Sequence, residues 1–306
     1  MYDLINIKPK KNVKIIIIVI SLLIILALLI NFIVIKNKRN ENTKIENSKV
    51  LEVASEAFEA QATDTNQDEQ GAKKEETKSE EVKLYESFND EQIQKIESIY
   101  KDTGEKRVFL TFDDGPSRTV TPHILDILKN ENIKATFFVL GNRVESSPDL
   151  VKRAYNEGHY IANHGYSHVY SSIYTSIEAI FNEYNKTEIC IQNALGNTNY
   201  HSNLFRFPGG SNGGKYDKLK QGAKEELKKN NIAYLDWNAL NSDSAGAKTE
   251  EELMENIKNT VGDKNSVVIL MHDAGDKVST YETLPDVIKF LKEKGYKFQN
   301  IYDLLN

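Results

Sequence analysis

The run Val108-Phe109-Leu110-Thr111-Phe112-Asp113-Asp114-Gly115-Pro116 is the most informative part of the chain. Its apolar, β-prone residues are typical of a buried strand, which ends in two adjacent carboxylates and a Gly-Pro turn. The acids therefore follow a strand's C-terminal end, where ligands bind in parallel α/β folds. Because adjacent carboxylates raise each other's pKa, we expect a metal ion or an arginine nearby. A simple Asx-type turn is the structural alternative.

Further apolar segments typical of strands follow at 135–140, 158–163, 205–207, 233–235, 267–271 and 296–298. Segments with helical periodicity separate them, among them 119–130, 148–156, 223–229 and 250–260. Strands alternating with helices predict a parallel sheet or barrel, and a domain of about 200 residues allows an incomplete (β/α) barrel. We therefore expect an α/β fold, with a lead-in helix within 86–100 packed on the domain.

The chain before residue 86 has a different character. Residues 13–35 form an almost unbroken aliphatic run, long enough to cross a membrane, after a basic segment at 1–12. The run is too long for a signal peptide and lacks a small-residue cleavage site, so we expect an uncleaved transmembrane signal anchor. Residues 36–85 are rich in Glu, Lys, Asn, Gln, Ser and Thr, which predicts a disordered linker. The folded domain then spans 86–306.

Composition excludes several classes of function. A formal net charge of −6, with no basic stripe interleaved with aromatics, argues against nucleic acid as a partner. The single cysteine, Cys190, excludes an intramolecular disulfide and a cysteine-rich zinc site, and its helical surroundings favour a buried structural thiol. The sequence indicates no protein partner.

His164 and His168 form an HxxxH pair, whose spacing places both imidazoles on one face of a helical turn, where they can share a metal ion. In the zinc-protease motif HExxH a glutamate follows the first histidine as the base, but Gly165 stands here. The adjacent Asp113 and Asp114 supply the missing parts, one as third ligand and the other as general base toward a bound water. Two histidines and one carboxylate also describe non-haem iron oxygenases, which remain an alternative.

Two later strand ends carry polar residues. Arg206 opens the segment Arg-Phe-Pro-Gly-Gly, and His272 follows the apolar run 267–271. A histidine opposite the base can protonate a leaving group, and Asp236, beside Trp237, could tune that histidine. Each residue alone could be a surface cap or a hydrogen-bonded strand end. Five strand ends that all carry catalytic residue types favour an active site.

The motifs TFDDGP, NHGYSH, FRFPGG, LDW and VILMHD, in this order, resemble those of the polysaccharide deacetylase family, also called the NodB-homology or carbohydrate esterase family 4 domain. The resemblance covers about 108–306. It implies a distorted, incomplete (β/α) barrel that removes acetyl groups from N-acetylated sugars with a divalent metal, Zn²⁺ first, with Co²⁺, Ni²⁺ and Mn²⁺ as alternatives. The implied catalytic residues are Asp113 as base, His272 as acid, Arg206 orienting Asp113 and Asp236 tuning the histidine. The implied metal ligands are Asp114, His164 and His168, and the implied substrate contacts are Pro208, Gly209, Leu270 and Trp237.

Three positions depart from the family pattern. Gly165 replaces a frequent Ser or Thr, so we expect one hydrogen bond that supports the ligands to be absent from this site. Gly209 replaces a common aromatic, which removes one wall of the sugar groove but leaves a backbone N–H for an oxyanion. A tryptophan expected after the fourth motif is absent, with Leu240 near its place. We expect these departures to leave the catalytic chemistry intact and to affect which substrate is bound.

The anchor and the resemblance together predict location and substrate. We expect a single-pass protein of the cell membrane, with residues 1–12 cytoplasmic and the catalytic domain outside, where it would reach peptidoglycan N-acetylglucosamine. Other acetylated glycans are alternatives: exported poly-N-acetylglucosamine, N-acetylmuramic acid residues, chitooligosaccharides and O-acetyl esters. A non-catalytic glycan-binding protein on the same fold is the alternative from another class.

Overall fold

The computed structural model describes residues 87–306, and its centre is strand β1 (Arg107–Asp113). All strand pairings are parallel, in the order β5-β4-β3-β2-β1-β7-β6, and β8 (Lys297–Gln299) also pairs with β1. The other strands are β2 (Thr136–Val139), β3 (Tyr160–Asn163), β4 (Leu204–Phe205), β5 (Ala233–Tyr234), β6 (Ala239–Leu240) and β7 (Ser266–His272). Within 87–306 no pairing joins β5 to β6, so the curled sheet remains open. The expected incomplete (β/α) barrel is confirmed.

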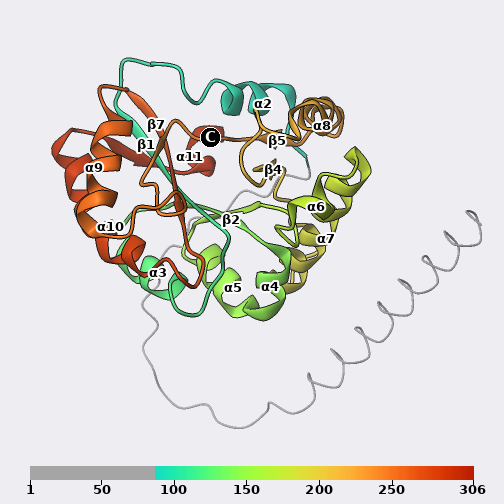
Figure 1. The fold of residues 1–306 in the computed structure, drawn as a ribbon, viewed down its shortest axis with the longest axis horizontal. Coiled ribbons are helices and arrows are strands. Elements are labelled where there is room, and N and C mark those ends of the chain that lie inside the picture. Colours follow the sequence, from blue (N-terminus) through green and yellow to red (C-terminus); the bar gives the residue numbers. More distant parts are fainter. Residues whose placement is uncertain (1–86) are drawn as a thin grey trace, which may run out of the picture. The chain divides into compact units, whose positions relative to one another are not determined.

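Helices pack on both sides of this sheet, most of them on its outer face (Figure 1). They are α2 (Asp90–Glu97), α3 (Thr121–Asn130), α4 (Gly141–Ser146), α5 (Pro148–Asn156), α6 (Tyr170–Ile173), α7 (Ile177–Leu195), α8 (Asp217–Lys229), α9 (Glu250–Val261), α10 (Val278–Glu293) and α11 (Ile301–Leu305). Cys190 of α7 is buried, as its helical surroundings predict. Helices that follow parallel strands return the chain across the sheet, so every strand ends at the same edge.

Alternation along β1 divides its side chains between two hydrophobic cores. Three of them pack in the outer core between sheet and helices: Val108, Leu110 and Phe112. Phe109 instead belongs to the inner core, on the concave side of the sheet. Because successive side chains of a strand point to opposite faces, Thr111 and Asp113 share the inner face with Phe109. The acid that ends the strand is therefore directed into the concave side.

Strand β7 has the same alternation and lies beside β1. Val267, Ile269 and Met271 are in the outer core, whereas Val268 is in the inner core. His272 is an even number of residues from Val268 and so shares its face. In the parallel register Asp113 lies opposite His272. The pairing of two adjacent strands thus brings the expected base and the expected acid to neighbouring positions.

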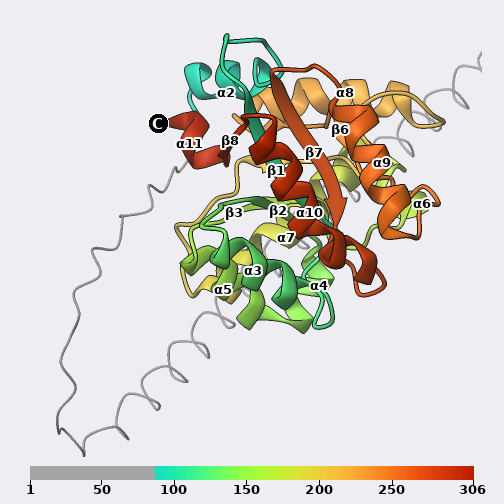
Figure 2. The ribbon, with the colours of Figure 1, turned by 90° about the vertical axis from the view of Figure 1, so that its left-hand side faces the viewer.

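Helices α2 and α11 fill the inner core, and Figure 2 shows them next to each other. Ile93 and Ile96 of α2 and Ile301 and Leu305 of α11 belong to this core. A capping box at Asn89 begins α2, which confirms the expected lead-in helix.

The expected anchor at 13–35 and linker at 36–85 lie outside the described residues. Between residues 87 and 306, none of the helices combines the length and the apolar character needed to cross a membrane.

Candidate active site

Arg206 holds the expected base. Its guanidinium is fully buried, and Nη1 donates to Asp113 Oδ1 at 2.7 Å and to Thr111 Oγ1 at 2.8 Å. The other guanidinium nitrogens donate to the carbonyl oxygens of Leu235 and Asp236, at 2.8 and 3.0 Å. Burial raises the pKa of Asp113, and the positive charge of Arg206 opposes that rise. The arginine therefore favours the ionised carboxylate that a general base requires.

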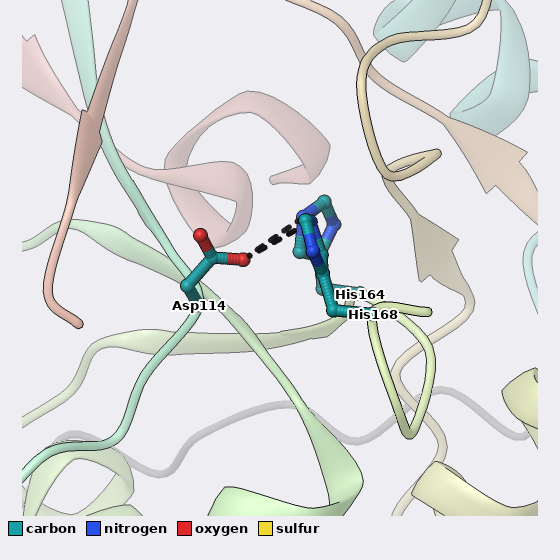
Figure 3. A group of neighbouring side chains, drawn as sticks. All are labelled: Asp114, His164 and His168. Atoms are coloured by element: carbon teal, nitrogen blue, oxygen red, sulfur yellow. Dashed lines mark ion pairs between the residues drawn. The ribbon is translucent and has the colours of Figure 1, made fainter. Parts of the chain in front are cut away.

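Asp114, His164 and His168 converge on one point (Figure 3). Asp114 Oδ1 lies 3.5 Å from His164 Nε2 and 3.4 Å from His168 Nε2. Two ligands of a tetrahedral zinc ion, each about 2.1 Å from the metal, are separated by about 3.4 Å, so the spacing fits such an ion. Asp114 Oδ1 is buried and has no hydrogen-bond partner within the described residues. A buried carboxylate oxygen without a donor fits the role of a cation ligand.

The protonation of His164 also suits a metal ligand. Its Nδ1 lies 2.8 Å from the backbone oxygen of Arg206, so Nδ1 donates and Nε2 keeps a lone pair toward Asp114. Burial lowers the pKa of His164 to about 3, although the charge of Asp114 opposes this. The imidazole is therefore neutral near pH 7, as metal coordination requires.

The two histidines lie in a loop between β3 and α6, so the expected helical turn is wrong. Gly165 and His168 have φ angles of +82° and +57°, which a right-handed helix cannot contain. Asp114 also has a positive φ, of 72°. Turns of the backbone, rather than the periodicity of a helix, bring the three ligand atoms together. The glycine at 165 suits its backbone conformation.

Glu183 of α7 holds this loop in place. Its Oε2 accepts hydrogen bonds from the backbone N–H groups of Tyr166 and Ser167, both at 2.7 Å. Its Oε1 accepts from Ser167 Oγ at 2.8 Å. A carboxylate from another element thus holds the loop between the two histidines. The sequence contained no signal for this contact, because Glu183 lies in an ordinary helical pattern.

Asp243, which the sequence analysis missed, is the partner of His272. Asp243 Oδ1 lies 2.6 Å from His272 Nδ1, while Oδ2 accepts from the His272 backbone N–H at 2.9 Å and from Thr280 Oγ1 at 2.7 Å. Burial disfavours the charged imidazole, but the hydrogen bond and charge of Asp243 outweigh it and raise the pKa of His272 to about 9. His272 is therefore protonated near neutral pH, as a general acid must be.

Asp236 does not contact His272 as expected. Its Oδ1 accepts from the Ser211 backbone N–H at 2.9 Å and its Oδ2 from Ser211 Oγ at 2.6 Å. Asp236 therefore fixes the loop after Gly209 instead of tuning the acid. Trp237 packs behind this loop, because a Cβ at Gly210 would meet its ring at 3.2 Å. Trp237 also lies against the inner core, so packing accounts for its position.

The remaining expected substrate contacts lie at the same edge. Leu270 is 5% exposed on β7, two residues before His272. Pro208 is buried and its carbonyl accepts the Tyr174 hydroxyl at 2.6 Å. Gly209 is exposed with a φ of +75°, so its backbone is accessible from solvent. Of these three positions, Gly209 is the exposed one.

Asp273, next to His272, supports the turn after Asp114. Thr121 Oγ1 donates to its Oδ2 at 2.6 Å, and burial raises the pKa of Asp273 to about 7. A Cβ at Gly115 would come within 2.0 Å of this carboxyl group. Only glycine at 115 therefore allows the turn to pack so closely on β7.

Comparison with known proteins identifies the family. A family model described as polysaccharide deacetylase matches residues 100–229. Over 209 residues the chain is 34% identical to the putative polysaccharide deacetylase YheN of Bacillus subtilis, covering 66% of this chain and 69% of that protein. The chain belongs to the polysaccharide deacetylase family.

Other members of the polysaccharide deacetylase family have names that state a substrate. The peptidoglycan-N-acetylglucosamine deacetylase PgdA of Listeria monocytogenes is 33% identical over 214 residues, which cover 69% of this chain but 41% of the relative. The chain thus spans about two fifths of the length of that protein. The solved catalytic domain of a peptidoglycan N-acetylglucosamine deacetylase from Eubacterium rectale is 30% identical, with a TM-score of 0.60, and covers 66% of this chain and 90% of that domain.

Proposed function

We propose that this polysaccharide deacetylase hydrolyses the N-acetyl groups of N-acetylglucosamine residues in peptidoglycan, with a bound divalent metal ion, Zn²⁺ in the first instance. The observation that carries the proposal is the arrangement at the strand ends. A carboxylate held by Arg206 lies beside a three-ligand group, and a charged histidine lies opposite it in the register. Names of relatives support peptidoglycan as the substrate.

Asp114, His164 and His168 would hold the metal. A divalent ion bound there supplies Lewis acidity and makes a water molecule acidic enough to lose a proton near neutral pH. Asp113 is the residue placed to accept that proton. Its Oδ1 is engaged by Arg206, whereas Oδ2 faces the ligand group and lies 3.7 Å from His164 Nε2. Asp113 therefore acts as the general base.

His272 supplies the proton that the departing amine needs. An amide nitrogen leaves poorly unless it is protonated, so a separate acid must face the base across the bond that breaks. Asp243 occupies Nδ1, which leaves Nε2 to carry the proton that is transferred. The Gly209 backbone N–H can donate to the oxyanion, and Asp236 fixes its loop through Ser211. The products are acetate and a free glucosamine nitrogen.

The residues of the site favour hydrolysis over iron-dependent oxygenation. Asp113, beside the ligand Asp114, can accept a proton. The protonated His272 across the site can donate one. An oxygenase needs neither group. Location outside the cytoplasmic membrane belongs to the same proposal, and the aliphatic run at 13–35 supports it.

The test is acetate release by the purified full chain, loaded with zinc or cobalt, from peptidoglycan and from N-acetylglucosamine oligomers. Release from both substrates supports the proposal. Faster release from N-acetylmuramic acid residues or from O-acetyl esters would identify a different substrate from the one proposed. Stoichiometric metal with no release from any acetylated glycan would favour a glycan-binding protein.

Removal of the metal should abolish acetate release. A chelator takes away the Lewis acid, and added Zn²⁺ should restore the rate. His168→Ala removes one of three ligands and should lower metal content at a fixed free-metal concentration, because two ligands bind far less tightly. Elemental analysis of the protein and the acetate rate measure the two effects. Full activity after complete metal removal would refute metal dependence.

The pH profile distinguishes Asp243 from Asp236. Since His272 must be protonated to act, the rate should fall as pH rises through its pKa of about 9. Asp243→Asn removes the hydrogen bond to a carboxylate and its charge, while burial still lowers the pKa. The alkaline limb should therefore move two or more pH units toward acid, to the ordinary value of 6.5 or below.

Asp236→Asn is the matched control, because it removes the same charge from the loop at Ser211. It should lower the rate without moving the alkaline limb. An equal shift in both variants would contradict the assignment of Asp243.

A further inference from the structure

Two exposed apolar side chains directly follow the metal ligand His168. Val169 is 48% exposed and Tyr170 is 39% exposed, at the start of α6. Isolated exposed hydrophobic residues need no explanation, but these two lie next to the reacting centre. The Tyr170 ring centroid is 5.4 Å from that of His168. An exposed aromatic ring therefore borders the site.

The Tyr170 ring is held in one position. It makes an edge-on contact with Tyr174, with 5.7 Å between ring centroids. Tyr174 is fixed in turn, because its hydroxyl donates to the Pro208 carbonyl at 2.6 Å and its ring stacks on Tyr216 at 4.9 Å. These contacts connect the segment around α6 with Pro208, in the loop that follows Arg206. A ring ordered before binding loses little entropy when a ligand covers it.

Tyr170 covers the place where a side chain at Gly209 would lie. A Cβ at position 209 would meet the Tyr170 hydroxyl at 2.5 Å and ring atoms at 3.1 and 3.2 Å. The absence of a side chain at Gly209 thus makes room for Tyr170, and the aromatic surface beside this glycine comes from α6. Burial and the charge of Asp114 raise the pKa of Tyr170, so its hydroxyl stays neutral.

Resting on the proposed function, we propose that Tyr170 forms the platform of a sugar subsite, on which a pyranose ring next to the deacetylated residue stacks. One face of a β-linked pyranose presents C–H groups, which pack on the face of an aromatic ring. The platform lies between the metal ligand His168 and the backbone of Gly209. The site would accordingly favour oligosaccharides over a single acetylated sugar.

The test compares Tyr170→Ala and Tyr170→Phe in the full, metal-loaded chain. Substrates are an N-acetylglucosamine tetramer and 4-nitrophenyl acetate, which has no sugar. Tyr170→Ala should raise KM for the tetramer roughly tenfold, the scale of losing part of an aromatic contact, with kcat changed less than about twofold. Tyr170→Phe should keep both parameters within about twofold, and neither variant should change kcat/KM for the ester.

A binding measurement separates this inference from the proposed function. In the Asp113→Asn background, calorimetry gives the Kd of the tetramer without turnover, and Tyr170→Ala should weaken it by the same factor. Ile189→Ala, at an exposed position on α7, is the control and should change nothing. An unchanged KM and Kd in Tyr170→Ala would overturn the platform. A large loss of kcat in Tyr170→Phe would also overturn it, because the hydroxyl would then act on the reaction.

If the wild-type chain releases no acetate but binds the tetramer through Tyr170, the deacetylase proposal fails and the subsite stands. If it releases acetate and Tyr170 has no effect on KM or Kd, the subsite fails and the deacetylase proposal stands.

Discussion

Asp113→Asn should reduce the turnover number for acetate release by roughly 10²–10⁴-fold, the usual contribution of a general base, while metal content stays unchanged. The amide keeps the size of the carboxylate but cannot accept a proton from water. Asp113 is not among the three ligand residues, so the metal should remain. Acetate release and elemental analysis of the same sample measure both quantities.

Asp114→Asn is the matched control for this substitution. It makes the same chemical change one residue further along the chain, in the ligand group itself. It should therefore lower both metal content and turnover. Substantial turnover in Asp113→Asn, or loss of metal from it, would contradict the assignment of Asp113 as base.

Arg206→Met should lower the free energy of unfolding by about 3–5 kcal/mol, because it leaves a buried carboxylate without its cation. The guanidinium is fully buried and lies 2.7 Å from Asp113 Oδ1. Without it, burial raises the pKa of Asp113 further, so the remaining activity should also move to higher pH. Denaturant unfolding of the metal-free chain measures the stability change, and the double variant with Asp113→Asn should lose less than the sum of both.

Arg153→Met provides the comparison. Arg153 has ion pairs of similar length, 2.6 Å to Asp126 and 2.9 Å to Glu157, but about a third of its side chain is exposed. Partly exposed pairs contribute about 0–1 kcal/mol, so this variant should remain near wild type. Equal losses in the two methionine variants would show that burial does not make the Arg206 pair special.

The long apolar strands were predictable from the sequence, and so were the approximate positions of β4, β5 and β8, whereas β6 was not. β1 and β7 each span seven residues, buried along almost their full length, and their polar ends marked the site. β6 has two residues, Ala239 and Leu240, which carry no recognisable period. The acid that follows β6 was therefore missed, and Asp236 was given the role that Asp243 has. β6 is placed by its pairing with β7 and by hydrogen bonds between the Leu240 backbone and Thr260 Oγ1, neither of which has a local signature.

The HxxxH spacing indicated the two histidines that face Asp114, but it predicted a helical turn where the structure has a loop. Four-residue spacing suits a helix, but Gly165 and His168 adopt positive φ angles that depend on the surrounding structure. Glu183, which holds this loop, is separated from it by α6 and the beginning of α7. Such contacts between distant segments have no local signature. For the same reason Tyr170 could not be connected with Gly209 before the fold was known.

Arg206 joins the two halves of the site. Its backbone oxygen accepts the Nδ1–H of His164 at 2.8 Å, and its side chain holds Asp113 at 2.7 Å. Arg206 is thus hydrogen-bonded both to the proposed metal ligand His164 and to the proposed base Asp113. Any displacement of Arg206 would therefore act on ligand and base at the same time.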